Sequence, residues 1–408
     1  MSANYHLFEV FGIELEYMLV DTTTMNVSPK VAELLTAKNG VLIDDIENGA
    51  IGWSNELVAH VVEIKTNGPT DELNSLAETF HQNICEINNL LKPLNSKLLG
   101  TACHPLMNPF EETKLWQHGS NEIYELYNQI FDCKGHGWSN LQSMHINLPF
   151  YDDEEFEKLH AAIRIVLPIL PGLCASSPIL DGKITGFKDS RLEQYKTNQK
   201  EIPVIAGKVI PEQVFSKEAY EKGIYTPIQK AIEPFNEDGI LDYHFVNSRG
   251  AIARFDRDAI EIRVIDIQEC PKADIAIAVF VIEVLKLLVS NLFTDLNSQK
   301  DWHQNELSHI LDSCIKYGEN YEITNFGYLE ELGLGDHSLV QDVWKHLYEQ
   351  TKNNIAPHYR EAIEIILNKG TLSTRIETAL QHDFSEENIK KVYRNLGECL
   401  TQNILFDI

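Results

Sequence analysis

Several common active-site signatures are missing from these 408 residues. The chain contains no GxxxxGK[ST] P-loop, no GxGxxG dinucleotide-binding turn and no GxSxG nucleophile elbow. These motifs mark P-loop, Rossmann and serine hydrolase sites, respectively, because each one places backbone N–H groups or a nucleophile at a defined turn. The sequence therefore lends no support to any of these three classes, and a nucleotide would need a different kind of binding site.

Paired cysteines and long apolar segments are also missing. The seven cysteines are scattered and odd in number, with no CxxC pair, which is typical of a reduced intracellular protein. The N-terminal segment lacks a basic stretch followed by an apolar one, so we expect no signal peptide. The most apolar segment, Ile275 to Phe293, is interrupted by Glu283 and Lys286 and is interpreted as a buried helix. We expect a cytoplasmic protein.

Positive charge is scarce. There are 34 Lys and Arg residues against 61 Asp and Glu residues, which gives a formal net charge of −27. An acidic surface repels nucleic acid and anionic membranes, so neither is an expected partner. A phosphorylated substrate would need divalent cations or a local basic patch. The composition, with 43% hydrophobic residues, predicts a folded chain that buries a large core.

The predicted strands cluster in the first two thirds of the chain. Alternation predicts strands at Phe8–Val20, Leu57–Lys65, Met144–Phe150 and Ala259–Ile267. Helical periodicity predicts helices at Glu72–Lys97, from Pro271 to about Asn297, and at Glu306–Tyr317, Ser338–Gln350, Tyr359–Asn368 and Glu386–Asn403. Thr70 or Asp71 should cap the first helix and Ser385 the last. Because strands and helices do not alternate regularly, we predict an α+β fold with an antiparallel sheet.

The segment from Lys183 to Lys208 has little periodicity and reverses the overall charge. It holds six basic and three acidic residues, a local net charge of +3. A long, basic, irregular segment could form a lid over an anionic substrate. A solvated surface loop would have the same composition, and the sequence does not separate the two interpretations.

The first predicted strand carries two carboxylates on one face. In Gly12-Ile13-Glu14-Leu15-Glu16-Tyr17, residues two apart share a face, so Glu14 and Glu16 point away from the apolar set. Hard oxygen ligands of this kind suit Mg²⁺ or Mn²⁺. An ordinary amphipathic strand with a solvated acidic face would show the same alternation.

Three further strands offer similar side chains. Glu63 lies within an apolar strand, where a charge is costly unless it is paired or bound to metal. Glu56 lies seven residues earlier, an odd spacing, so it can join Glu63 only if it precedes the strand or a bulge intervenes. His145 and Asn147 share a face of a third strand, although a lone histidine is also an ordinary structural residue.

On the fourth strand a glutamate and an arginine share a face. Glu261 and Arg263 could form a simple salt bridge, or they could hold a metal and a phosphate oxygen. Recurrence on four strands favours a function, because one sheet would gather these groups into an acidic basin that needs cations. Cys133-Lys134-Gly135-His136, followed by His145, loosely resembles half of a zinc site, but the sequence has no second CxxC-type pair of ligands to complete it.

Five motifs in order resemble glutamate–cysteine ligase family 2, a family of carboxylate–amine ligases in the glutamine synthetase-like superfamily. They are GIELEY, ELVAHVVEIKTNGP, GWSNLQSMHINLPF, ASSPILDGKITGFKDSR and AIEIRVIDIQ, between about Phe8 and Leu288. The resemblance implies a curved antiparallel sheet with helices on its convex side. We expect a single catalytic domain over residues 1–408, with the motifs between about 8 and 290 and a helical portion from about 300 to 408.

The resemblance also implies roles for single residues. The implied metal ligands are Glu14, Glu16, Glu56, Glu63, His145 and Glu261. Arg263 and Glu63 are the implied catalytic residues, with Arg263 facing the transferring phosphate. The implied contacts with substrate or ATP are Asn147, Arg191, Arg249 and Arg254. Mg²⁺ or Mn²⁺ would be the cofactor and ATP the co-substrate.

The implied reaction joins a carboxylate to an amine through an acyl phosphate, and the expected carboxylate is the γ-carboxylate of glutamate. Ala259-Ile260 stands where many members carry Gly-Thr, and Lys188–Pro211 also departs from the common pattern. The acceptor amine therefore stays open, with cysteine as the default. Two alternatives are a guanidine-type phosphotransferase and a non-catalytic metal- or nucleotide-binding protein on the same fold. Partners are expected to be small molecules, and a homo-oligomer is left open.

Overall fold

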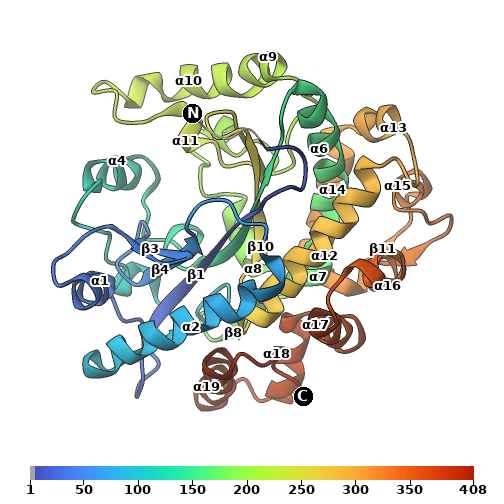
Figure 1. Ribbon diagram of the computed structural model, residues 1–408. Coiled ribbons are helices and arrows are strands. Elements are labelled where there is room, and N and C mark those ends of the chain that lie inside the picture. Colours follow the sequence, from blue (N-terminus) through green and yellow to red (C-terminus); the bar gives the residue numbers. More distant parts are fainter. Residues whose placement is uncertain (1–4) are drawn as a thin grey trace.

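The computed structural model describes residues 5–408 and contains one large antiparallel sheet covered by helices (Figure 1). Its strands are β1 (Gly12–Asp21), β2 (Asp45–Asn48), β3 (Ile51–Asn55), β4 (Val61–Thr66), β5 (Ser96–Leu99), β6 (Ser143–Pro149), β9 (Ala251–Arg254) and β10 (Ala259–Asp266). The order is β2-β3-β4-β1-β6-β10-β9, and β5 pairs with the second half of β1. The predicted α+β class with an antiparallel sheet is confirmed.

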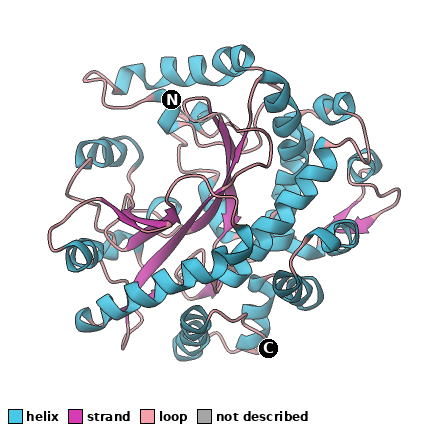
Figure 2. Cartoon of the chain, in the orientation of Figure 1, coloured by secondary structure: helices cyan, strands magenta, loops and turns pink. Residues whose placement is uncertain are grey.

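Helices make up most of the remaining regular structure (Figure 2). Those before the last sheet strand are α1 (Val31–Asn39), α2 (Leu73–Leu91), α3 (Pro109–Glu112), α4 (Asn121–Phe131), α5 (His136–Ser139), α6 (Asp153–Val166), α7 (Pro171–Cys174), α8 (Ser190–Tyr195), α9 (Lys217–Tyr220), α10 (Thr226–Ile232) and α11 (Tyr243–Val246). Those after it are α12 (Pro271–Val289), α13 (Leu296–Asp301), α14 (Gln304–Tyr317), α15 (Phe326–Glu331), α16 (Val340–Thr351), α17 (Pro357–Lys369), α18 (Leu372–Leu380) and α19 (Glu386–Gln402).

Most predicted helices are present with shifted ends. The helix predicted at Glu72–Lys97 ends at Leu91, because Pro93 follows and the chain then enters β5. The prediction that Thr70 or Asp71 caps this helix was wrong. The N-cap residue is Glu72, and its side chain makes no capping hydrogen bond. The predicted cap at Ser385 is confirmed, since its side chain accepts a hydrogen bond from the Asn388 backbone N–H. Two short hairpins, β7 (Ile179–Leu180) with β8 (Lys183–Ile184) and β11 (Glu322–Ile323) with β12 (Ser338–Leu339), were not predicted.

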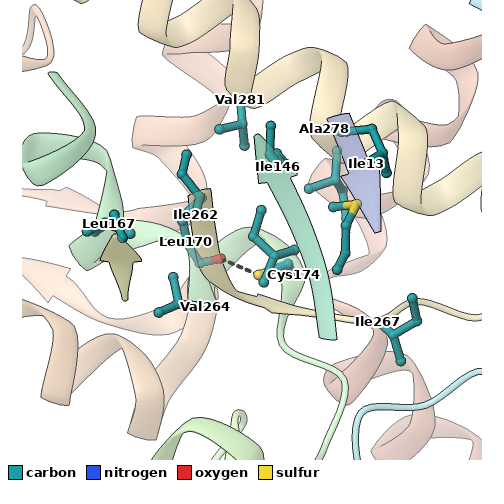
Figure 3. Close-up of a cluster of buried hydrophobic side chains, with 14 of the residues drawn as sticks. Ile13, Ile146, Leu167, Leu170, Cys174, Ile262, Val264, Ile267, Ala278 and Val281 are labelled. Atoms are coloured by element: carbon teal, nitrogen blue, oxygen red, sulfur yellow. Dashed lines mark hydrogen bonds between the residues drawn. The ribbon is translucent and has the colours of Figure 1, made fainter. Parts of the chain in front are cut away.

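One face of the sheet is apolar and packs on helices. Ile13 of β1, Ile146 of β6 and Ile262 of β10 are almost completely buried and lie beside Ala278 and Val281 of α12 (Figure 3). Strand alternation places these side chains together, and burying them is the main driving force for docking the helices. The other face of the same strands must therefore carry the polar side chains.

The C-terminal helices cover part of this second face. Met18 of β1 lies on the same side of the strand as Glu14 and Glu16, and it is completely buried. It belongs to an apolar cluster that also contains Leu99, Leu372 of α18 and Leu396 of α19. The helical C-terminal portion thus closes one end of the polar face and leaves the other end to the carboxylates.

Within residues 5–408, no helix combines the length and apolar character required to cross a membrane. Residues 1–4 lie outside the described part of the chain, and they begin the segment in which we expected no signal peptide.

Candidate active site

Strand register brings four carboxylates together on the polar face. Glu16 of β1 lies directly opposite Glu63 of β4, and Glu14 lies opposite Lys65. Glu56 follows the end of β3 and precedes β4, so the odd spacing to Glu63 does not separate the two side chains. Carboxylate oxygens of Glu16, Glu56 and Glu63 lie within 4.8 Å of one another. The turn before β4 therefore resolves the open question about Glu56.

Strands β6 and β10 complete the cluster. His145 Nδ1 lies 2.9 Å from Glu14 Oε2 and 3.6 Å from Glu261 Oε1. Ligand atoms of Glu14, Glu63 and His145 form a second group within 4.8 Å. Asn147 Nδ2 donates to Glu14 Oε1 over 3.0 Å. All six residues predicted as metal ligands thus converge, although the structure alone does not assign them that role.

Two of the predicted arginines lie at this cluster. Arg263 Nε is 2.9 Å from Glu261 Oε1, but its N–H is not aimed at that oxygen and has no hydrogen-bond partner among the described residues. Arg254 Nη1 lies 3.9 Å from Glu261 Oε2, while its Nε and Nη2 donate to Asp256. Arg263 therefore lies beside Glu261 with one buried N–H that lacks a hydrogen-bond partner among the described residues.

The other two arginines are each engaged in an ion pair with a carboxylate outside the six predicted ligands. Arg191 is 2% exposed, and its Nε lies 2.5 Å from Asp266 Oδ1. Arg249 is 1% exposed and donates from Nε and Nη2 to the two oxygens of Glu212, over 2.5 and 2.7 Å. We expected both to contact substrate or phosphate, but the structure pairs each with a carboxylate that is distant in sequence. The positive charge of each guanidinium is therefore already neutralised by a protein carboxylate.

The central part of the segment from Lys183 to Lys208 is buried, so it forms neither a lid nor a solvated loop. It forms β8 and α8, and Asp189, Ser190, Arg191 and Leu192 are all buried. Asp189 Oδ1 caps α8 by accepting a hydrogen bond from the Leu192 backbone N–H. The excess basic charge is neutralised by tertiary ion pairs, such as that between Lys188 and Glu377. Local composition could not reveal these partners.

Burial and mutual repulsion oppose the ionisation of two carboxylates in the cluster. Burial and the charge of Glu14 raise the pKa of Glu63 to about 7. Burial and the charges of Glu63 and Glu16 also raise the pKa of Glu56 well above its usual range. Burial opposes ionisation of Glu14, but the hydrogen bond and charge of His145, the hydrogen bond from Asn147 and the charge of Arg263 together outweigh it and lower the Glu14 pKa to about 2.

The pKa of His145 responds to the same carboxylates. Burial lowers it, but the hydrogen bond to Glu14 and the charge of Glu16 dominate and raise it above the usual value. Carboxylate oxygens with one imidazole are a donor set that Mg²⁺ or Mn²⁺ accepts. The residues present therefore fit a divalent cation, which would relieve the repulsion among them.

Sequence reasoning missed three side chains that organise the cluster. Lys65 Nζ lies 3.0 Å from Glu63 Oε1, and Ser54 Oγ donates to the same oxygen over 2.9 Å. The backbone N–H and Oγ of Ser143 donate to Glu16 Oε2 over 2.7 and 2.9 Å. Lys65 and Ser143 each lie two residues from a predicted ligand, so strand alternation would have placed both on the polar face.

Known proteins provide an independent comparison. The family model described as glutamate–cysteine ligase family 2 matches residues 10–395. An uncharacterized protein of Archaeoglobus fulgidus is 30% identical over 400 residues, covering 97% of this chain and all of that protein. A protein of Bradyrhizobium sp. named "Putative glutamate–cysteine ligase 2" is 26% identical over 233 residues, 55% of this chain and 50% of that protein. The chain thus matches about half the length of that named relative.

Solved structures share the fold. A glutamate–cysteine ligase from Francisella tularensis, determined in complex with AMP, matches with a TM-score of 0.64 at 14% identity, over 98% of this chain and 90% of that one. A bifunctional glutathione synthetase from Pasteurella multocida matches with a TM-score of 0.57 at 14% identity, over 96% of this chain and 52% of that one.

The ordered motifs, the polar sheet face that they form and the family match over residues 10–395 lead to one conclusion: the chain belongs to glutamate–cysteine ligase family 2.

Proposed function

We propose that the protein is an ATP- and Mg²⁺-dependent ligase that joins a carboxylate to an amine through an acyl phosphate. The observation that carries the proposal is the convergence of six metal-competent side chains with the guanidinium of Arg263, which lies beside Glu261. Phosphoryl transfer needs this combination, because cations neutralise the phosphates and an arginine stabilises the charge that develops during transfer.

The proposed cation ligands form two overlapping groups. Glu14, Glu63 and His145 make up one, and Glu16, Glu56 and Glu63 the other. Glu261 would join the first group, because its Oε1 lies 3.6 Å from His145 Nδ1. Bound Mg²⁺ would neutralise the phosphate oxygens of ATP and polarise the γ-phosphorus.

Other residues would bind and orient the substrates. The planar guanidinium of Arg263 can donate two parallel hydrogen bonds to phosphate oxygens. The ammonium group of a lysine has no such planar pair of donors. We assign Glu63 a catalytic part because it is the carboxylate that both groups share. Asn147 donates a hydrogen bond to Glu14, and we assign it to contacts with substrate or ATP. Arg254 lies at the edge of the cluster and would contact substrate if Asp256 released it.

The proposed reaction has two balanced steps. A carboxylate oxygen of the substrate attacks the γ-phosphorus, the bond to the β–γ bridging oxygen breaks, and ADP leaves. The amine nitrogen then attacks the acyl carbon, phosphate leaves, and the nitrogen releases a proton. The protein contributes mainly by positioning the reactants and stabilising charge.

Family membership supports glutamate as the carboxylate substrate, and the named relative supports cysteine as the default amine. The solved Francisella tularensis ligase binds AMP, which supports an adenine nucleotide as co-substrate. The partners are then small molecules, and the predicted cytoplasmic location agrees with metabolites of this kind.

A screen of amines for phosphate release tests the proposal. The protein is incubated with ATP, Mg²⁺, glutamate and one amine at a time, and phosphate is measured. We expect release that requires glutamate and increases strongly with one class of amine. A phosphotransferase would transfer phosphate to a guanidine without glutamate, and a binding protein would release none. Either result would contradict the ligase.

A further inference from the structure

A lysine, Lys65, lies at the border of the carboxylate cluster. Lys65 is directly opposite Glu14 in the β1–β4 ladder. Its Nζ lies 3.0 Å from Glu63 Oε1, 3.1 Å from Ser54 Oγ and 3.3 Å from Asp45 Oδ2. The side chain is 30% exposed, so its ammonium group is held at the border of the cluster and not in bulk water.

These contacts occupy one oxygen of the central carboxylate. Glu63 Oε1 accepts hydrogen bonds from both Ser54 Oγ and Lys65 Nζ. Glu63 also belongs to both groups of candidate cation ligands. A carboxylate that bridges two cations usually offers one oxygen to each, but here only Oε2 is free of a protein donor among the described residues.

We propose that Lys65 is a fixed internal cation that limits how many divalent ions this site binds and how tightly. Its ammonium takes the place of a further divalent cation beside Glu63, and it turns the free oxygen of Glu63 toward a single ion. Lys65 is therefore a positioning residue that acts through Glu63. The inference rests on the proposed metal site and adds to it a determinant of cation number.

Cation binding without nucleotide separates this role from a purely structural one. Mn²⁺ is titrated into the full-length protein by calorimetry, with Mg²⁺ as a competitor. Lys65→Met removes the charge and keeps the length of the side chain, and Lys65→Arg keeps the charge. Lys272→Met is the matched control, because Lys272 is similarly exposed and makes one ion pair, 2.9 Å long, with Glu361 far from the cluster.

We expect Lys65→Met to bind Mn²⁺ about tenfold more tightly or to bind an additional ion, because a positive charge a few ångströms from the ligands has been removed. Lys65→Arg and Lys272→Met should match the unaltered protein. Ser54→Ala, which frees Glu63 Oε1 from its other donor, should shift affinity in the same direction by a smaller factor and provides a second test if Lys65→Met does not fold. Unchanged or weaker binding by folded Lys65→Met overturns the role of Lys65 alone. No Mn²⁺ binding by the unaltered protein overturns the metal site and this inference together.

Discussion

Glu16 on β1 and Glu63 on β4 are direct partners across two antiparallel strands. Like charges in this position destabilise a sheet unless a proton or a cation lies between them. Glu63 is 8% exposed, so water does little to relieve the repulsion. We therefore expect this pair to make the stability of the fold depend on pH and, through the proposed metal site, on divalent cations.

The metal-free protein should lose stability as pH rises from 4.5 to about 7. Glu63 has a folded-state pKa of about 7, raised by burial and by the charge of Glu14, against an ordinary value of 4.5. Below pH 4.5 both states hold its proton. Above that pH the unfolded state releases the proton first, so the free energy of unfolding falls, by about 3 kcal/mol in total for this shift.

Thermal unfolding in EDTA at about pH 5 and pH 8 measures this loss, and adding Mg²⁺ at the higher pH should reverse most of it. Glu63→Gln should flatten both the pH dependence and the response to Mg²⁺. Glu78→Gln, at an exposed site on α2, is the control. Melting temperatures that are independent of Mg²⁺ at both pH values would contradict the metal site.

Arg263→Lys should lose most of the activity with little loss of stability. Lysine keeps the positive charge but lacks the planar group that holds two phosphate oxygens. Activity is measured as ADP formation and stability by thermal unfolding. Arg257→Lys is the control, because Arg257 lies on the turn after β9 with 61% of its side chain exposed. Near-full turnover of Arg263→Lys would show that Arg263 is only an ion-pair partner of Glu261.

Asp266→Ala should destabilise the protein by about 3–5 kcal/mol, because it leaves the buried charge of Arg191 without a partner. Denaturant unfolding measures the change. Glu193→Ala, which removes one of the two carboxylate partners of the partly exposed Lys196, should cost less than about 1 kcal/mol. If Asp266→Ala had full stability and mainly weakened binding of ATP or glutamate, Arg191 would be a substrate contact after all.

The C-terminal helices should unfold together with the sheet. Leu396 of α19 is completely buried in the cluster that contains Met18 and Leu99, so Leu396→Ala should cost about 2–5 kcal/mol. Circular dichroism and tryptophan fluorescence should report one coincident transition, as expected for the single domain that we predict. Lys391→Ala, at an exposed position of the same helix, is the control. Two separate transitions would divide the chain into independent units.

The sequence was sufficient wherever a local pattern decided the outcome. Alternation placed Glu14 and Glu16 on one face of β1, and the same rule placed His145 and Asn147 together on one face of β6. The apolar faces of these strands were predictable for the same reason. Burial of the apolar face of each strand then fixes which side of the sheet the polar side chains occupy, because a shift by one residue would turn the apolar side chains toward solvent.

Tertiary pairing and backbone irregularity were not predictable. Arg191 and Arg249 looked like ligands because their partners, Asp266 and Glu212, are 75 and 37 residues away in sequence. A register shift in β10 between Ile262 and Ile265 brings Asp266 opposite Ser143, on the polar face, although alternation from Glu261 would place it on the apolar one. Local periodicity carries no signal for such a shift.

Product analysis with hydroxylamine tests the central claim most directly. Hydroxylamine is a small nucleophile that should intercept an activated carboxylate as a hydroxamate, whichever amine is the natural acceptor. The protein is incubated with ATP, Mg²⁺, glutamate and hydroxylamine, and nucleotides and hydroxamate are quantified, with reactions lacking glutamate or Mg²⁺ as controls. The ligase mechanism predicts ADP and glutamyl hydroxamate in equal amounts, and neither in the controls. Formation of AMP and pyrophosphate, or ADP release that no carboxylate affects, would contradict it.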